Sequence, residues 1–445
     1  MKYKSLAKFS PGRTILLSLF SVIAIGTLLL TLPFARNTFI PFTDLFFTST
    51  SATCVTGLFT VPMENFTRFG HFIIMLLIQV GGLGLMTMSL FVISLFTDLG
   101  LAAQFMAGKI LQLETWKNIR KMLLFIIIIT LASEAIGAIL LFTSFRYDYP
   151  LSEAIFMSVF HSISAFCNSG INLLPHGIAN YSHSYKVLST IGILMFCGGI
   201  GFVTWHEIFS HLKSPNWKRK ISFSLHSKIV LRTAIALTLF FTVLFWLLER
   251  NSTLANMSPG LAIVNSIFNS IGARSAGFVT IPIVNLQLAS ILIVLVACFI
   301  GSAPGSTGSG IKTTTFSIFM STLKSAITGK LAVEMYGRTI PRHQVLKAFA
   351  VLALSISWII FAVFCLLITE RSWSFLTVLF EVVSAFSTLG LSMLGKTADF
   401  TLTGKLILVI TMIIGRIGPL TTVLALKKPS EKQEFSYPEE RVMIG

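Results

Sequence analysis

The stretch SAFCNSGIN, residues 164–172, is short, half apolar and contains a glycine near its end, and related stretches recur along the chain. The related stretches read ATCVTGLF (52–59), GARSAGFV (272–279) and SAFSTLGLS (384–392). Their shared glycines are Gly57, Gly170, Gly277 and Gly390, which lie 113, 107 and 113 residues apart. A chain of 445 residues accommodates four units of about this length, so the spacing predicts four structural repeats.

Long apolar segments flank each of these short stretches. They fall at about 14–34, 71–97, 122–144, 187–211, 231–248, 286–325, 346–368 and 404–426. Each is long enough to cross the roughly 30 Å hydrocarbon core of a bilayer as a helix. The short stretches, at about 41–56, 151–169, 260–276 and 373–389, are rich in Ser and Thr. They are typical of re-entrant helices that enter the membrane and turn back.

The composition points to a membrane protein as well. Charged residues are 11% of the chain and hydrophobic residues 54%, with a net charge of +17, whereas a soluble domain has about 25% charged residues. A positive charge on a polytopic protein is explained by basic cytoplasmic loops, so no nucleic-acid partner is expected. The five cysteines are scattered through apolar segments, which predicts neither a disulfide framework nor a metal site.

The basic residues also predict the orientation of the repeats. The two tails and the linkers that separate the repeats hold 23 of the 34 Lys and Arg residues. This bias does not alternate from one linker to the next, so each repeat crosses the membrane twice and both termini are cytoplasmic. The predicted fold is an all-α polytopic membrane protein with eight spans and four re-entrant pore loops, arranged as four parallel repeats around a central pore. The repeats are 1–108, 109–220, 221–335 with a broken second span, and 336–445 with a cytoplasmic tail.

Four parallel glycine turns at membrane depth suggest a cation path. Non-helical backbone is tolerated there only where it is buried or lines water, and its free carbonyls become ligands. The carboxyl end of each short helix adds partial negative charge, and rings of carbonyls replace the hydration shell of an ion in potassium-type filters. Taken singly, each glycine is as well explained as a helix cap; the fourfold recurrence favours a filter.

These features resemble the Ktr/Trk/HKT superfamily of potassium transporters, specifically its KtrB-type bacterial membrane subunit. The resemblance rests on the four glycines, the break at 301–310 and Arg416. It implies K⁺ uptake across the bacterial plasma membrane through a pore within each subunit, homodimerisation, and control by a cytosolic KtrA-type nucleotide-binding ring. The nucleotide would be bound by that partner, no covalently bound cofactor is implied, and a dependence on Na⁺ is left open. Basic linkers also suit lipid head groups.

Mapped onto this chain, the resemblance implies K⁺ coordination by backbone carbonyls next to the glycines. The implied filter residues are Val55, Thr56, Gly57, Asn168, Ser169, Gly170, Ser275, Ala276, Gly277, Thr388, Leu389 and Gly390. An ion-coupled secondary transporter of monovalent cations, driven by Na⁺ or H⁺, is the alternative, because broken helices and internal repeats occur there too.

The stretch GSAPGSTGSGIK, residues 301–312, interrupts the sixth long segment and nearly spells a phosphate-binding loop. The lysine stands one place late and no strand precedes the loop, so an enzyme that uses nucleotide is disfavoured. In the other repeats only small glycine kinks are expected at this depth. We therefore predict that the segment is a gate below the filter. The predicted gate residues are Gly301, Gly305, Ser306, Thr307, Gly308, Gly310, Lys312 and Arg416.

Charged residues within the membrane pattern need partners or water. Arg416 is interpreted as a tether to the gate or a barrier in the pore, with a structural pair to Glu134 as the alternative. Arg274 is expected to point into the helix packing behind the filter, with Glu381 or Asp44 as its partner.

Overall fold

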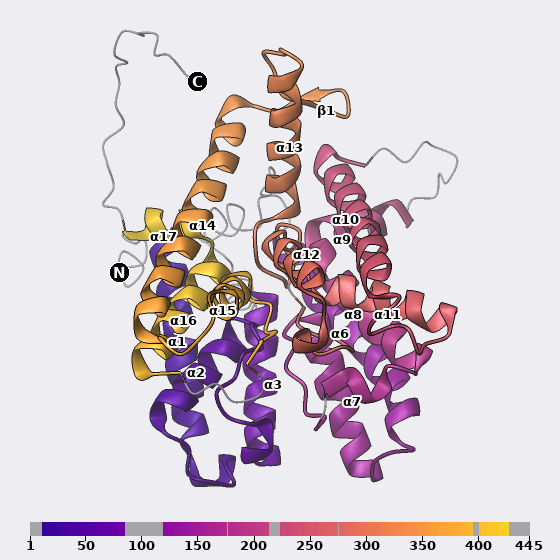
Figure 1. Ribbon diagram of the computed structural model, residues 1–445, viewed down its shortest axis with the longest axis vertical. Coiled ribbons are helices and arrows are strands. Elements are labelled where there is room, and N and C mark those ends of the chain that lie inside the picture. The colour runs from indigo at the N-terminus through magenta and orange to yellow at the C-terminus, as the bar shows by residue number, and fades with distance from the viewer. Residues whose placement is uncertain are drawn as a thin grey trace.

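The computed structural model describes residues 11–84, 119–175, 177–212, 223–274, 276–394 and 400–426, and within them the chain is almost entirely helical (Figure 1). The first quarter contains α1 (Pro11–Leu30), α2 (Phe42–Thr53) and α3 (Arg68–Leu83). The second contains α6 (Ile119–Phe145), α7 (Leu151–Phe166), α8 (Tyr185–Ile200) and α9 (Phe202–Leu212). The third contains α10 (Leu225–Glu249), α11 (Pro259–Gly272), α12 (Leu288–Phe299) and α13 (Thr313–Ile327). The fourth contains α14 (Arg342–Thr369), α15 (Phe375–Ser387), α16 (Leu402–Ile417) and α17 (Pro419–Leu426).

Short elements complete the described chain. Four 3₁₀ turns lie at Pro33–Ala35 (η2), Met63–Asn65 (η3), Gly177–Tyr181 (η4) and Ile283–Asn285 (η5). Two two-residue strands, β1 (Glu334–Met335) and β2 (Arg338–Thr339), form an antiparallel hairpin between α13 and α14. This hairpin and the adjoining ends of α13 and α14 project beyond the rest of the helices (Figure 1).

Local sequence explains where several helices begin. The side chains of Thr67, Ser184 and Thr401 accept a hydrogen bond from the amide three residues later, which caps α3, α8 and α16. Prolines occupy the N-cap positions of α2 and α7, at Pro41 and Pro150, where a missing N–H costs no helical hydrogen bond.

Four described helices are long and apolar enough to cross a membrane: α1, α6, α10 and α14. Two more spans are counted if each bent pair, α8 with α9 and α16 with α17, is one span. The bends are 99° and 98°, so the expectation of small kinks is wrong at these two places. Each bend falls at a glycine with positive φ, Gly201 (94°) or Gly418 (92°), a conformation that lets the chain turn where a side chain would resist.

The helices that follow the short helices of the first and third quarters, α3 and α12, are shorter within the described chain. Helix α3 ends at Leu83, one residue before the described stretch ends at Gly84, and α12 has only 12 residues before the 301–312 segment. The apolar faces of the long helices are open, as at Ile128, Ile136 and Ile139 of α6. An apolar face of this kind is expected where helices meet lipid rather than water.

The first and last quarters of the chain lie side by side, with α1 against α17 and α2 against α16 (Figure 1). Arg13 Nε donates to the carbonyl of Ala425 at 2.8 Å. Lys405 Nζ of α16 lies 2.5 Å from Asp44 Oδ1 of α2. These contacts close the described quarters into a ring.

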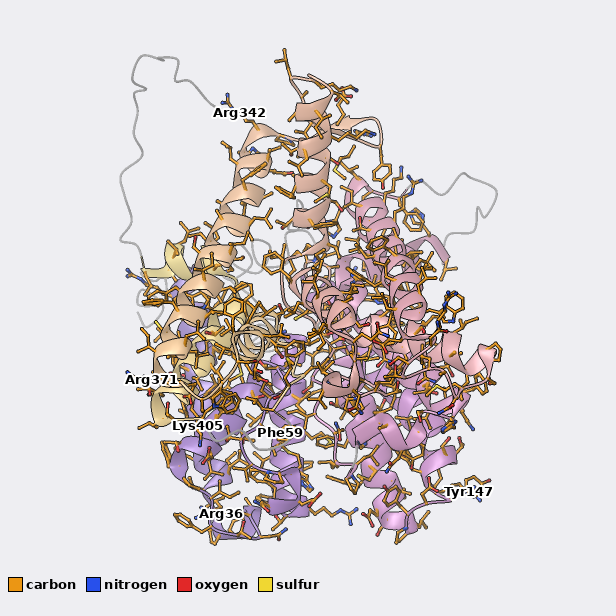
Figure 2. All side chains as sticks on the ribbon, in the orientation of Figure 1. Arg36, Phe59, Tyr147, Arg342, Arg371 and Lys405 are labelled. Atoms are coloured by element: carbon orange, nitrogen blue, oxygen red, sulfur yellow. The ribbon has the colours of Figure 1, made fainter. Side chains whose placement is uncertain are left out.

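The two ends of the molecule differ in the loops that they carry. Figure 2 shows Arg342, in a predicted cytoplasmic linker, at the opposite end from Arg36 and Tyr147, which lie in loops predicted on the other side. The buried core lies where the short helices meet. Phe47 of α2, Phe160 of α7 and Phe380 of α15 are at most 1% exposed there.

Candidate functional site

The four glycine turns share an unusual backbone. Their φ angles are 90° at Gly57, 70° at Gly170, 73° at Gly277 and 85° at Gly390. Two residues earlier, Val55, Asn168 and Thr388 are left-handed as well, with φ of 57°, 58° and 49°. Ser275, the corresponding predicted filter residue of the third turn, lies outside the described residues. Left-handed non-glycine residues are costly and persist only where their surroundings hold them.

Hydrogen bonds at the ends of the short helices hold these turns. The amide of Thr56 donates to Ser51 O, that of Ser169 to Ser164 O, and that of Leu389 to Ser384 O, each at 2.8 Å. In the third turn the amide of Gly277 donates to Gly272 O at 3.0 Å. Bonds that reach back five residues belong to a helix C-cap with a left-handed residue. Each short helix therefore directs its carboxyl end into its turn.

The turns meet one another in a ring. A Cβ on Gly57 would overlap the carbonyl oxygen of Ser169, and a Cβ on Gly277 would overlap that of Leu389. A Cβ on Gly390 would likewise overlap Thr56 O, and one on Gly170 would lie 3.0 Å from Ala276 O. Each glycine thus faces the carbonyl that precedes the glycine of a neighbouring turn, in the order one, two, three, four and back to one. We call these four turns, residues 55–57, 168–170, 276–277 and 388–390, the glycine ring.

A cavity of about 420 Å³ opens above the glycine ring. All four ring glycines line it, together with Phe59, Asn172 and Glu381. Figure 2 shows Phe59 between the two halves of the molecule. On one wall, η4 is held by Tyr181, whose hydroxyl donates to Asp148 Oδ2 at 2.7 Å. Burial and this acceptor raise the pKa of Tyr181, so the phenol keeps its donor proton at neutral pH.

A polar side chain of each short helix braces the chain just beyond its turn, at the third residue after the glycine. In the first quarter Asp44 accepts a hydrogen bond from Thr60 Oγ1 at 2.6 Å, and in the second His161 Nε2 accepts one from the Leu173 amide at 3.3 Å. In the third quarter Asn269 Oδ1 accepts one from the Thr280 amide at 3.1 Å, and in the fourth Glu381 Oε1 accepts one from the Met393 amide at 2.9 Å. Sequence reasoning missed these braces. The four bracing residues are of different types and lie 13, 9, 8 and 9 residues before their glycines, among several other polar residues, so no shared motif marks them.

The braces also correct the expected partner of Arg274. Asp44 and Glu381 are engaged as just described, and no carboxylate of the described chain pairs with this guanidinium. Arg274 does point into helix packing: Nη1 donates to Ala234 O and to Thr238 Oγ1, both at 3.1 Å. Carbonyl and hydroxyl oxygens, two of them on α10, accept from this buried guanidinium in place of a carboxylate.

The 301–312 segment lies directly against the glycine ring. The Thr307 hydroxyl donates to Phe166 O at 2.9 Å and accepts from Asn168 Nδ2 at 2.8 Å, and Asn168 belongs to the ring. The segment is also held by the bend between α8 and α9, because Gly305 O accepts from the Phe202 amide at 2.9 Å. Its two ends meet, since the Ser302 amide donates to Ser309 O at 3.1 Å.

Arg416 joins three parts of the molecule beneath the ring. Its Nη1 donates to Thr307 O at 2.6 Å and to Ser309 Oγ at 3.1 Å, and its Nη2 donates to the carbonyl of Gly81 in α3. Lys312 Nζ donates to Gly308 O at 2.8 Å within the segment. The predicted gate residues are therefore together, with Arg416 from the fourth quarter touching the segment of the third.

The alternative pair of Arg416 with Glu134 is wrong. Among the described residues no basic side chain lies within ion-pair distance of Glu134. Its carboxylate is 3.8 Å from Cys167 Sγ, and Gln79 of α3 lies beside it. The five cysteines are free, and the described chain holds no group of three or more His, Cys, Asp and Glu side chains placed for a metal.

The long apolar helices place the chain in the class of multi-pass membrane proteins. The chain belongs to the TrkH family, described as "Cation transport protein", which it matches over residues 13–436. It is a transport protein, not an enzyme.

Curated relatives extend over the whole chain. The Ktr system potassium uptake protein B of Vibrio alginolyticus is 36% identical, covering 99% of this chain and 96% of the relative. The potassium/sodium uptake protein NtpJ of Enterococcus hirae is 33% identical, covering 100% and 99%. The crystal structure of the potassium transporter TrkH from Vibrio parahaemolyticus superposes with a TM-score of 0.76 at 19% identity, covering 96% of this chain and 87% of that one. That last likeness supports the fold.

Proposed function

We infer that this chain takes up potassium ions across the bacterial plasma membrane through a pore whose filter is the glycine ring. The observation that carries the proposal is the mutual contact of the four turns, in which each glycine faces a carbonyl of its neighbour. Carbonyl oxygens replace the hydration shell of K⁺, and the carboxyl ends of four short helices add negative potential. The full-length relatives named as potassium uptake proteins support K⁺ as the ion.

In this proposal the described helices form four parallel repeats, each a long helix, a re-entrant short helix and a second long helix. The count of eight spans adds α3 and the pair α12 and α13 to the six spans counted by length. Both termini lie in the cytoplasm, as the distribution of basic residues predicts. Because four like-oriented repeats direct their turns to one axis, the pore runs within a single chain.

The 301–312 segment is proposed as the gate on the cytoplasmic side of the filter. Thr307 bonds to a ring residue from below, and Arg416 holds the segment through two acceptors while also bonding to α3. With these bonds made, the segment obstructs the ion path. Opening requires that Arg416 give up its acceptors on the segment, since these bonds join the segment to α16.

Regulation is proposed to come from outside the chain. Three relatives are named as parts of a Ktr system, and a cytosolic nucleotide-binding ring of the KtrA type would act on the cytoplasmic loops of a homodimer. The nucleotide would belong to that partner. Basic cytoplasmic linkers offer an acidic partner or lipid head groups a surface of opposite charge.

Flux measurements test the proposal directly. Purified protein in liposomes should conduct ⁸⁶Rb⁺ down its own gradient with neither a Na⁺ nor a proton gradient present. A strict requirement for a second gradient would contradict a pore and favour the ion-coupled transporter. One relative is named a potassium/sodium uptake protein, so Na⁺ should be tested both as a driving ion and as a competing ion.

A further inference from the structure

One arginine stands at a matched position where the other repeats carry no charge. Three residues before the ring glycines lie Cys54, Cys167, Arg274 and Ser387. Arg274 is only 9% exposed, and a guanidinium stays charged in proteins. The third repeat, which contains Arg274, is also the one that contains the 301–312 segment. Two exceptional features therefore occur in the same repeat.

The two features are in contact. Arg274 Nη2 donates to the carbonyl oxygen of Gly301 at 3.3 Å, while Nη1 bonds to Ala234 and Thr238 of α10. Gly301 is the first residue of the segment. The guanidinium therefore links three places: the end of α11 behind the third turn, the middle of α10, and the start of the segment.

Gly301 itself packs differently from its counterparts. In the other repeats a Cβ on Gly81, Gly198 or Gly415 would overlap the carbonyl of Thr53, Phe166 or Phe386, each four residues before a ring glycine. Those contacts seat the second long helix directly on the end of the short helix. A Cβ on Gly301 would instead overlap Ser309 O of its own segment. In the third repeat, the hydrogen bond from Arg274 to Gly301 O connects the end of the short helix α11 with the end of α12.

The position also suits a cation. Arg274 follows the carboxyl end of α11, whose C-cap is Ala273, and cations are stabilised at a helix C-terminus. Its acceptors are carbonyl and hydroxyl oxygens, and hydrogen bonds from a charged donor are about twice as strong as neutral ones. Nε of Arg274 has no hydrogen-bond partner within the described chain. Burying such a donor is costly, so the site keeps an arginine at a cost to stability.

We propose that Arg274 is a positioning residue that anchors the start of the 301–312 segment to the end of α11, so that segment and third filter turn move together. Arg416 holds the segment near its other end, at Thr307 and Ser309. Opening therefore pivots about the end fixed by Arg274. The proposal rests on the proposed role of the segment as a gate.

A thiol-labelling experiment tests the anchor without relying on flux. Ser306 in the segment is half-buried, so Ser306→Cys reports exposure of the segment to a membrane-impermeant maleimide added from the cytoplasmic side. Labelling of protein without this substitution gives the background from the natural cysteines. Arg274→Gln should raise the labelling rate about tenfold, because a charge-assisted hydrogen bond is lost. Arg371→Gln, an exposed arginine, is the matched control and should change nothing.

Two further variants separate anchoring from folding and from charge. Thr238→Val keeps the charge and removes one acceptor of Arg274, so it should raise labelling in the same direction by a smaller factor. Arg274→Lys keeps the charge but loses the planar fork that serves α10 and Gly301 together, so it should resemble Arg274→Gln. Wild-type labelling in Arg274→Lys, or unchanged labelling in both Arg274→Gln and Thr238→Val, would overturn the proposal.

Flux in a deletion background distinguishes failure of the anchor from failure of the gate. Arg274→Gln should raise ⁸⁶Rb⁺ flux in the intact chain but change it less than about twofold once residues 303–308 are removed. An equal change in both backgrounds would mean that Arg274 acts independently of the segment, which contradicts the anchor. Unaltered flux on deletion alone would refute the gate, while the labelling result would still decide the anchor.

Discussion

At the scale of single residues, the ring glycines are required for two separate reasons. Their φ angles of 70° to 90° disfavour any side chain, and a Cβ at three of them would overlap a neighbouring carbonyl. The sequence predicted these four positions, because glycines at a fixed spacing leave a visible pattern. It did not predict that each glycine contacts the next repeat, since contact across repeats leaves no periodic signal.

Gly277→Ser is the sharpest test of the ring. The new Cβ must displace the carbonyl of Leu389, which the proposal makes an ion ligand. Backbone strain of this kind costs about 1–3 kcal/mol, so we expect the K⁺ concentration for half-maximal uptake to rise about tenfold and the K⁺/Na⁺ preference to fall. Gly329→Ser is the matched control, because Gly329 has a similar φ of 66° but nothing within 4 Å of its Cβ. Unchanged uptake in Gly277→Ser would count against the filter.

Arg416→Ala tests the tether below the ring. The substitution removes donors to Thr307 O, Ser309 Oγ and Gly81 O together, so the segment loses its link to α3 and to the fourth repeat. We expect ⁸⁶Rb⁺ flux to rise severalfold at similar expression, since hydrogen bonds from charged groups contribute about 1.5–3 kcal/mol. Arg371→Ala serves as the exposed control. A fall in flux with intact folding would show that Arg416 supports conduction rather than closure.

At the scale of elements, the 301–312 segment is held by contacts that its composition does not reveal. Backbone hydrogen bonds tie it to α8, to Phe202 and to itself. The bends of 99° and 98° in the second and fourth quarters of the chain were missed for a related reason. A glycine in an apolar run is compatible with a slight kink or a sharp turn, and the choice depends on tertiary contacts that periodicity does not record.

Deletion of residues 303–308 tests the segment as a gate. Ser302 and Ser309 are already hydrogen-bonded to each other, so the excision joins residues in contact and should leave α12 and α13 in place. Loss of Thr307 and its bonds to Phe166 and Asn168 removes the obstruction below the ring. We expect higher ⁸⁶Rb⁺ flux and a weaker response to any cytosolic regulator. Abolished flux in a monodisperse, well-folded protein would refute the gate.

At the scale of the whole molecule, the first and last quarters of the chain lie side by side. The residues that join these two quarters could not be found from the sequence. Asp44 and Lys405 are 361 positions apart and belong to no motif. Their pairing depends on how α2 and α16 approach, and an acidic residue near a helix start is equally explained by the helix dipole.

The closing ion pair gives a test of the assembled ring. The side chains of Lys405 and Asp44 are 18% and 9% exposed, so removing one partner leaves the other charge largely desolvated. Asp44→Asn and Lys405→Met should each lower the thermal midpoint of the detergent-solubilised protein by several degrees. The double variant should recover part of that loss, with a coupling energy of about 1–3 kcal/mol. The exposed pair Lys330 and Glu334, at 60% and 53%, is the control, because surface ion pairs contribute little. Strictly additive losses at Asp44 and Lys405 would mean that the pair does not hold the first and fourth quarters of the chain together, and closure would then rest on the packing of α1 against α17 and of α2 against α16.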